Sequence, residues 1–337
     1  MRERNLKHLR NRRTQKLRVK NGVLLCFVAV LALTLSACSS LSRKIRGGDT
    51  SQPQGFIGPI DAGSAMGPQP EEVKEVFVFV GPGMSAALTG IGVIRALSEE
   101  GIRVSVVAGM EFGSFVAAAY SASGSLNEME WPILQFKKDW VAPSGGISRF
   151  FSSSKKSPID LQRGIEKLFR EKPLEQLKLP TWTFDIYARG EAQVFSRGPV
   201  SSALCVALAN PEWMDPCPDG GSPAPLSGTF RDQWESTGLR LPVVWVVAPS
   251  LDVEATARAG AEGKAAVAIR RSQDVFLRRV QESRSGNDLE IRPSVAIRDY
   301  FDFDRRSELV YAGKRDAKKQ IGEWMSRLGW SREKKLR

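Results

Sequence analysis

Short apolar runs alternate with helical stripes of apolar residues over most of the chain. Residues 76–80 (Val-Phe-Val-Phe-Val) are typical of a strand buried on both faces. The apolar stripe in 86–100 predicts a helix that ends at Gly101. Residues 102–108 then predict a second strand, and 114–122 a second helix. Because strand and helix alternate, we expect a parallel sheet with right-handed crossovers.

The same pattern continues downstream. It predicts helices over 159–169 and 199–208, surface helices over 270–282 and 315–328, strands over 181–186 and 241–248, a mobile loop over 141–157 and an irregular connection over 219–240.

The first 37 residues have the pattern of a secretory signal. A basic segment from Arg2 to Lys20 precedes an apolar run from Val23 to Leu35, and Leu35-Ser-Ala-Cys38 follows. Cys38 in this setting resembles the acylated cysteine of bacterial lipoproteins. The alternative, a transmembrane anchor, requires about 20 apolar residues, and this run is shorter. We therefore expect a signal peptide over 1–37, a flexible tether over 38–72, one domain over 73–328 and a basic tail over 329–337.

Removal of this signal changes the net charge of the protein and therefore the partners that the charge implies. The whole chain carries a net charge of +12, but residues 1–37 contain nine of its Lys and Arg residues and one acid. The remainder has 40 basic and 36 acidic residues, which argues against nucleic-acid binding. His8, the only histidine, lies in the signal, so a Ser-His-Asp triad and a His-ligated metal are excluded.

Two cysteines, Cys205 and Cys217, remain beyond Cys38. In an exported protein they could form a disulfide, or they could be two separate buried thiols, and the sequence does not decide between these alternatives. We expect no metal and no cofactor, because no cysteine cluster has metal-ligand spacing.

Residues 104–120 combine a buried strand, a sharp turn and a helix of small residues. Gly109 and Gly113 flank Glu111 at the apex of the turn. This is the layout of the nucleophile elbow, G-x-S-x-G, in which the tight turn exposes a Ser hydroxyl. Here a carboxylate replaces the hydroxyl.

Several segments, in the same order along the chain, resemble the bacterial patatin-like phospholipases. They are residues 92–102, 109–120, 166–180, 184–185, 195–198, 219–221 and 242–247. The resemblance implies a three-layer α/β/α fold with a mainly parallel central sheet, and lipid acyl hydrolysis by a Ser-Asp dyad. It places Asp219, in Asp219-Gly-Gly, at the catalytic Asp, and Glu111 at the nucleophile.

The resemblance also places the Gly-rich oxyanion loop of the family on residues 82–87. Gly83 keeps the glycine, Pro82 has no N–H to donate, and Met84 carries a side chain where glycine is usual. Nucleophile and oxyanion loop are thus both altered, which favours a catalytically impaired relative.

Other interpretations of these residues stay open. Ser114 or Ser85 could replace the missing nucleophile. Glu111 and Asp219 could form a carboxylate pair for acid/base work or cation binding, or Glu111 could accept hydrogen bonds from elbow N–H groups at the start of the helix. Aromatic residues Trp131, Phe136, Trp140, Phe150 and Phe151 could form a lid at a membrane interface, or belong to the core.

We therefore expect an envelope lipoprotein that is anchored by Cys38 and binds a phospholipid, a fatty-acyl ligand or a protein partner. Ser39 is not an acidic retention residue, so by resemblance to other lipoproteins an outer-membrane location on the periplasmic face is expected. The alternative is an active, divergent lipid acyl hydrolase that uses Asp219 with an unrecognised nucleophile.

Overall fold

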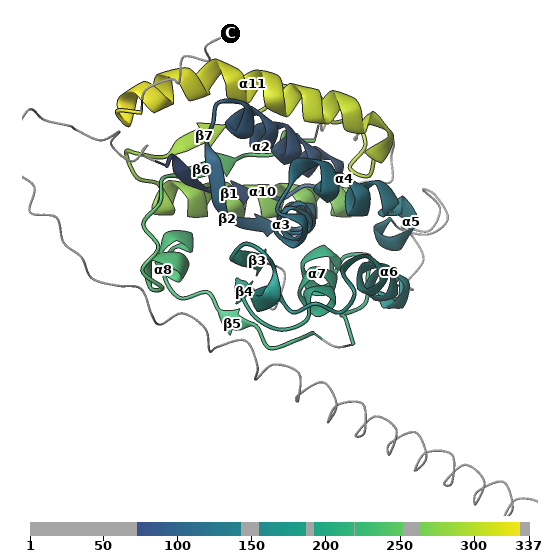
Figure 1. The fold of residues 1–337 in the computed structure, drawn as a ribbon. Helices are drawn as coiled ribbons and strands as arrows, with labels where there is room; N and C mark the ends of the chain where they lie inside the picture. Colours follow the sequence, from purple (N-terminus) through teal and green to yellow (C-terminus); the bar gives the residue numbers. More distant parts are fainter. Residues whose placement is uncertain (1–72, 143–154, 187–191, 219, 252–262, 331–337) are drawn as a thin grey trace, which may run out of the picture. The chain divides into compact units, whose positions relative to one another are not determined.

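A mainly parallel sheet forms the centre of the fold. The computed structural model describes residues 73–142, 155–186, 192–218, 220–251 and 263–330, all within one compact unit. Among these residues, seven strands form one sheet in the order β5-β4-β3-β2-β1-β6-β7 (Figure 1). The strands are β1 (Glu75–Val80), β2 (Arg103–Met110), β3 (Thr181–Asp185), β4 (Gln193–Phe195), β5 (Ala224–Pro225), β6 (Val243–Val246) and β7 (Leu289–Ile291). The pairs among β3, β2, β1, β6 and β7 are parallel, and β4 and β5 are antiparallel at one edge.

Helices lie on both faces of this sheet (Figure 1). They are the 3-10 turn η1 (Ser85–Leu88), α2 (Thr89–Glu99), α3 (Phe112–Ser123), α4 (Leu126–Gln135), α5 (Lys138–Val141), α6 (Ile159–Phe169), η3 (Leu174–Gln176), α7 (Val200–Leu208), α8 (Phe230–Glu235), α10 (Gly263–Ser283), η4 (Phe303–Arg305) and α11 (Arg306–Arg327). The expected three-layer α/β/α arrangement with a mainly parallel sheet is confirmed.

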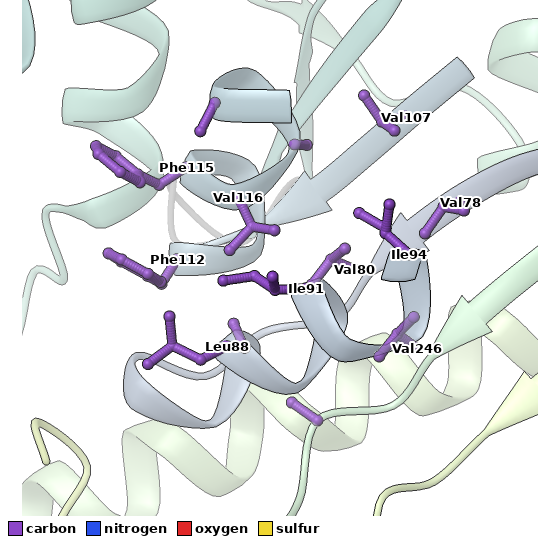
Figure 2. Close-up of a cluster of buried hydrophobic side chains, with 14 of the residues drawn as sticks. Val78, Val80, Leu88, Ile91, Ile94, Val107, Phe112, Phe115, Val116 and Val246 are labelled. Carbon is purple, nitrogen blue, oxygen red and sulfur yellow. The ribbon is translucent and has the colours of Figure 1, made fainter. Parts of the chain in front are cut away.

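The central strand β1 shows how the sequence builds three layers. Its valines, Val76, Val78 and Val80, belong to one buried cluster, while Phe77 and Phe79 belong to the other. Because successive side chains of a strand point to opposite faces, a continuous apolar run supplies both cores at once. Val80 lies near Ile91 of α2 and Val116 of α3 in the first core (Figure 2). Phe79 packs against Phe230 of α8 and Phe276 of α10 in the second core.

Helix α11 is part of the core, which corrects the expectation of a surface helix over 315–328. It begins at Arg306 and crosses α2 at two glycines. A Cβ on Gly92 would lie 2.0 Å from the carbonyl oxygen of Val310, and one on Gly313 would lie 2.0 Å from that of Thr89. Only glycine permits this close approach of two helix backbones. The predicted surface helix over 270–282 is longer than expected and buries Phe276 and Val280.

The expected irregular connection over 219–240 contains a helix, α8. Thr229 and Asp232 form a capping box at its start, with each side chain accepting from the other's backbone N–H. Hydrogen bonds from the Thr229 backbone N–H and side chain to the Asp232 carboxylate lower the pKa of Asp232. The helix buries Phe230 and Trp234, an apolar pair four residues apart that the sequence analysis did not use. Of the expected mobile loop over 141–157, residues 143–154 lie outside the described residues.

Cys205 and Cys217 are joined in a disulfide, so the first of the two alternatives holds. The bond ties α7 to the segment that leads towards Gly220 and Gly221. Cys38, the signal, the tether and the end of the basic tail lie outside the described residues. Within the described part of the chain, no helix combines the length and apolar character that a bilayer span requires.

Candidate functional site

Glu111 is the residue between β2 and α3, and its backbone is strained. Its φ of 49° and ψ of −127° lie in a region that a side chain with a Cβ rarely adopts. Such a conformation costs about 1–3 kcal/mol and persists only where the surrounding structure enforces it. The sharp strand-to-helix turn of an elbow is therefore present, with a glutamate at its apex.

Close backbone approach accounts for both flanking glycines. A Cβ on Gly109 would lie 2.2 Å from the backbone of Gly113. A Cβ on Gly113 would lie 2.3 Å from the carbonyl oxygen of Val80 in β1. Both distances are too short for any side chain. The glycines of the elbow are thus required by the turn itself, whatever residue stands at the apex.

The carboxylate of Glu111 is buried and accepts hydrogen bonds from three separate parts of the chain. The Gly83 N–H donates to Oε2 at 2.8 Å, the Ser272 hydroxyl donates to Oε1 at 2.6 Å, and the Tyr300 hydroxyl donates to Oε2. Glu111 itself is only 2% exposed. A buried carboxylate is costly unless such donors replace water, so this network is what stabilises a charge here.

This geometry contradicts one of the two interpretations of Glu111. In that interpretation its carboxylate accepts hydrogen bonds from N–H groups of the elbow at the start of α3. Glu111 is the residue that precedes this helix, but its side chain makes no capping hydrogen bond there. The carboxylate instead reaches the loop after β1, α10 and the segment after β7. Its role is therefore to join distant segments.

The loop after β1 directs its N–H groups inward. Gly83 has a φ of 135°, which favours glycine, and this backbone directs its N–H to Glu111. The Ser85 N–H donates to the carbonyl of Tyr300 at 3.1 Å. Met84 is 1% exposed, and its side chain belongs to the core. Two N–H groups of the loop that resembles an oxyanion loop are thus used by the protein itself.

Neither alternative serine is placed as an exposed nucleophile. Ser114 is fully buried in α3, and its hydroxyl donates to the carbonyl of Gly109 at 2.7 Å. Ser85 is also fully buried, and its hydroxyl donates to the carbonyl of Asp299 at 3.3 Å. Both hydroxyls thus hold backbone segments of the site in place.

Asp219 lies outside the described residues, so its distance to Glu111 stays untested. The residues around it are placed: Cys217 is held by the disulfide, and Gly221, with a φ of 66°, lies against Phe195 and Ser202. The carboxylate pair of Glu111 and Asp219 therefore remains a prediction. Among the described residues, no group of three or more His, Cys, Asp or Glu is arranged to hold a metal ion.

Ser272 and Tyr300 were missed by the sequence analysis. Ser272 lies in α10 and Tyr300 in the segment after β7, 161 and 189 residues from Glu111. Both are buried, at 1% and 6% exposure. A hydroxyl in an ordinary helix and a single tyrosine carry no local pattern, so only the folded arrangement identifies them.

The aromatic stretch divides between core and surface. Phe136 is buried among Phe112, Phe115 and Phe303, and Trp140 packs on Phe136. These two residues belong to the core, as in the second interpretation. Trp131 is 55% exposed, while Phe150 and Phe151 lie outside the described residues.

Comparison with known proteins matches a large part of the described chain to one protein family. Residues 77–216 match the family model of the patatin-like phospholipases. This match extends from β1 through the elbow to the segment before the disulfide's Cys217. The chain therefore carries a patatin-like phospholipase domain.

Curated relatives that match part of this chain are much longer proteins. Over 112 residues, 32% of this chain, it is 31% identical to lysophospholipase NTE1 of Pyricularia oryzae. Over 125 residues, 34% of the chain, it is 30% identical to the human patatin-like phospholipase domain-containing protein 6. The alignments span 7% and 8% of those two proteins.

Solved structures with a similar arrangement include VipD from Legionella pneumophila and the type III effector protein ExoU. VipD aligns with a TM-score of 0.43 and 12% identity, over 75% of this chain and 67% of its own. ExoU aligns with a TM-score of 0.32 and 13% identity, over 74% of this chain and 53% of its own.

Proposed function

We propose that this chain is a membrane-anchored, patatin-like envelope lipoprotein that no longer hydrolyses esters and acts by binding a lipid or a protein partner. We infer the loss of catalysis from one observation. The Glu111 carboxylate stands at the position of the nucleophile and accepts a hydrogen bond from the Gly83 N–H.

Ester hydrolysis by a Ser-Asp dyad needs a hydroxyl to attack and N–H groups to stabilise the oxyanion. In this chain the carboxylate of Glu111 stands at the apex. It accepts a hydrogen bond from the Gly83 N–H, which would otherwise be directed at the substrate. A negative charge at this position also repels a developing oxyanion. Loss of one oxyanion donor lowers the rate by on the order of 10²–10³, and loss of the nucleophile costs more.

Fluorophosphonate labelling of the full chain tests this proposal, because the probe reacts covalently with activated serines. We expect no labelling of the wild type and no hydrolysis of short-chain esters. We expect labelling of Glu111→Ser, at residue 111 only, because this change supplies a hydroxyl and releases the Gly83 N–H. Glu111→Ala is the matched control, since it releases the same N–H without supplying a nucleophile. Labelling of the wild type at any serine would overturn the proposal.

The hydrogen bond from Ser272 to Glu111 supports a second candidate function. In this candidate, Ser272 is the nucleophile and Glu111 the base, which inverts the positions of the dyad in the family. The hydroxyl and the carboxylate are 2.6 Å apart, as such a pair requires. Against it, Ser272 is 1% exposed and Gly83 already donates to Glu111. A fluorophosphonate adduct on Ser272 that disappears in Ser272→Ala would establish this candidate in place of the first.

Acylation of Cys38 is tested separately from catalysis. We expect the wild type to incorporate a labelled fatty acid in a bacterial host and to fractionate with the outer membrane. We expect Cys38→Ser to lose the label and to retain its signal peptide, because acylated cysteine is the new N-terminus in lipoproteins. Cys205→Ser is a control that leaves Cys38 intact. Unchanged labelling of Cys38→Ser would contradict a lipid anchor at this residue.

A further inference from the structure

A cavity of about 250 Å³ lies between α2, α4 and α11, away from the elbow. Its floor is apolar and comes from residues of all three helices, Ile91, Ile133 and Val310. These helices lie on the same face of the sheet (Figure 1), and all three contribute residues to one buried cluster. The cavity is therefore formed by helices that belong to the core of the domain.

Large exposed apolar side chains gather at this cavity. Leu134 of α4 and Tyr311 of α11 line it, and they are 55% and 65% exposed. Trp131, which is 55% exposed, lies one helical turn before Leu134 on the same face of α4. Exposed apolar residues that cluster beside a cavity indicate an interaction surface, whereas scattered ones do not.

The polar part of the cavity is mainly cationic. Arg95, Arg306 and Lys314 line it together with one carboxylate, that of Glu130. Arg95 forms an ion pair with Glu130, and Lys314 with Glu99 at 2.5 Å. The Nε of Arg306 is buried and finds no acceptor among the described residues. A buried guanidinium N–H without an acceptor is costly, so an anionic group from outside would be stabilised here.

We propose that this surface binds the interface of a phospholipid bilayer, with Arg306 receiving the phosphate of an anionic headgroup. The headgroup region of a bilayer favours surfaces that combine Trp, Tyr and Leu with Arg and Lys. Aromatic rings enter this region, while the cations contact phosphate groups. The apolar side chains distinguish this occupant from a free phosphate ion, which would gain nothing from Trp131 or Leu134. The inference does not depend on whether the elbow is inactive.

The test measures hydrogen exchange of the full chain with phosphatidylcholine vesicles, with and without phosphatidylglycerol. Peptides covering α4 and the first turns of α11 report binding at this surface, whether or not Cys38 carries an anchor. We expect slower exchange in both peptides, and about fivefold stronger protection when phosphatidylglycerol is present, as one added cation–lipid contact gives.

Variants at Trp131, Leu134 and Arg306 separate the apolar contribution from the cationic one. Trp131→Ser with Leu134→Ser should abolish the protection, and Arg306→Gln should remove only the preference for phosphatidylglycerol. Val267→Ser, which changes an apolar residue that is 66% exposed elsewhere, is the matched control and should change nothing. No protection on vesicles, equal protection with and without phosphatidylglycerol, or equal protection by inorganic phosphate alone would each overturn the proposal.

Discussion

At the scale of single residues, Glu111 combines two features that oppose each other. Its backbone conformation is unfavourable, and its carboxylate is buried. Hydrogen bonds from Gly83, Ser272 and Tyr300 offset both costs. Three donors from separate segments of the chain are arranged around this carboxylate. The carboxylate is therefore an integral part of this fold.

We expect Glu111→Gln to destabilise the protein by about 2–4 kcal/mol, because hydrogen bonds to a charged acceptor contribute about 1.5–3 kcal/mol each and the new amide NH₂ would face donors. Urea unfolding of the wild type and the variant measures this change. Glu171→Gln is the matched control, since Glu171 also has a positive φ, of 53°, but is exposed. A change for Glu111→Gln no larger than that of the control would show that the network contributes little.

At the scale of elements, the position of α11 is fixed by polar contacts as well as by its glycine crossing with α2. Asp316 is 5% exposed and accepts from the Ser294 N–H at 2.8 Å, which ties α11 to the segment after β7. Arg315 also contacts both Asp316 and the carbonyl of Ser294. The Arg315 guanidinium, the Ser294 N–H and Lys319 hold the pKa of Asp316 well below its usual range.

This lowered pKa predicts how the stability of the protein depends on pH. Asp316 contributes fully above its unfolded pKa of about 4, and the contribution is lost as the pH falls towards its lower folded pKa. We expect Asp316→Asn to cost about 1–3 kcal/mol at pH 7, and this difference to shrink below about pH 4. Urea unfolding at a series of pH values measures it, with the exposed Asp304→Asn as control. A difference that is constant with pH would contradict the assigned cause.

At the scale of the whole molecule, the sequence was sufficient for the strands β1, β2, β3 and β6 and for the elbow, but not for the edges of the sheet or for the closure of the site. Continuous apolar runs and flanking glycines are local signals, so these strands and the elbow were predicted close to their observed positions. The strands β4, β5 and β7 were not predicted, because each has only two or three residues and leaves no detectable pattern. Helix α8 was missed because its apolar pair, Phe230 and Trp234, is short and stands in a polar segment. The donors Ser272 and Tyr300 could not be predicted, since contacts over such separations leave no periodicity in the chain.

The disulfide also acts at this scale, because it joins α7 to the segment before Gly220 and Gly221. It closes a loop with a sequence separation of 12, for which loss of the bond costs roughly 3 kcal/mol. We expect the Cys205→Ser, Cys217→Ser double variant to lose about 2–4 kcal/mol of unfolding free energy. Adding a thiol reductant should destabilise the wild type by the same amount and leave the variant unchanged. Equal stability of the two proteins under oxidising conditions would contradict this prediction.

The separations within the Glu111 network also have a consequence for biosynthesis. Gly83 is 28 residues from Glu111, but Ser272 and Tyr300 are 161 and 189 residues further along the chain. The elbow therefore leaves the ribosome long before two of its donors have been synthesised. Until residue 272 has been synthesised, only Gly83 of these three donors is available to the strained backbone and the carboxylate of Glu111, and Tyr300 follows later still. The segment that matches the family, residues 77–216, thus depends on the last third of the chain to bury its most unusual residue.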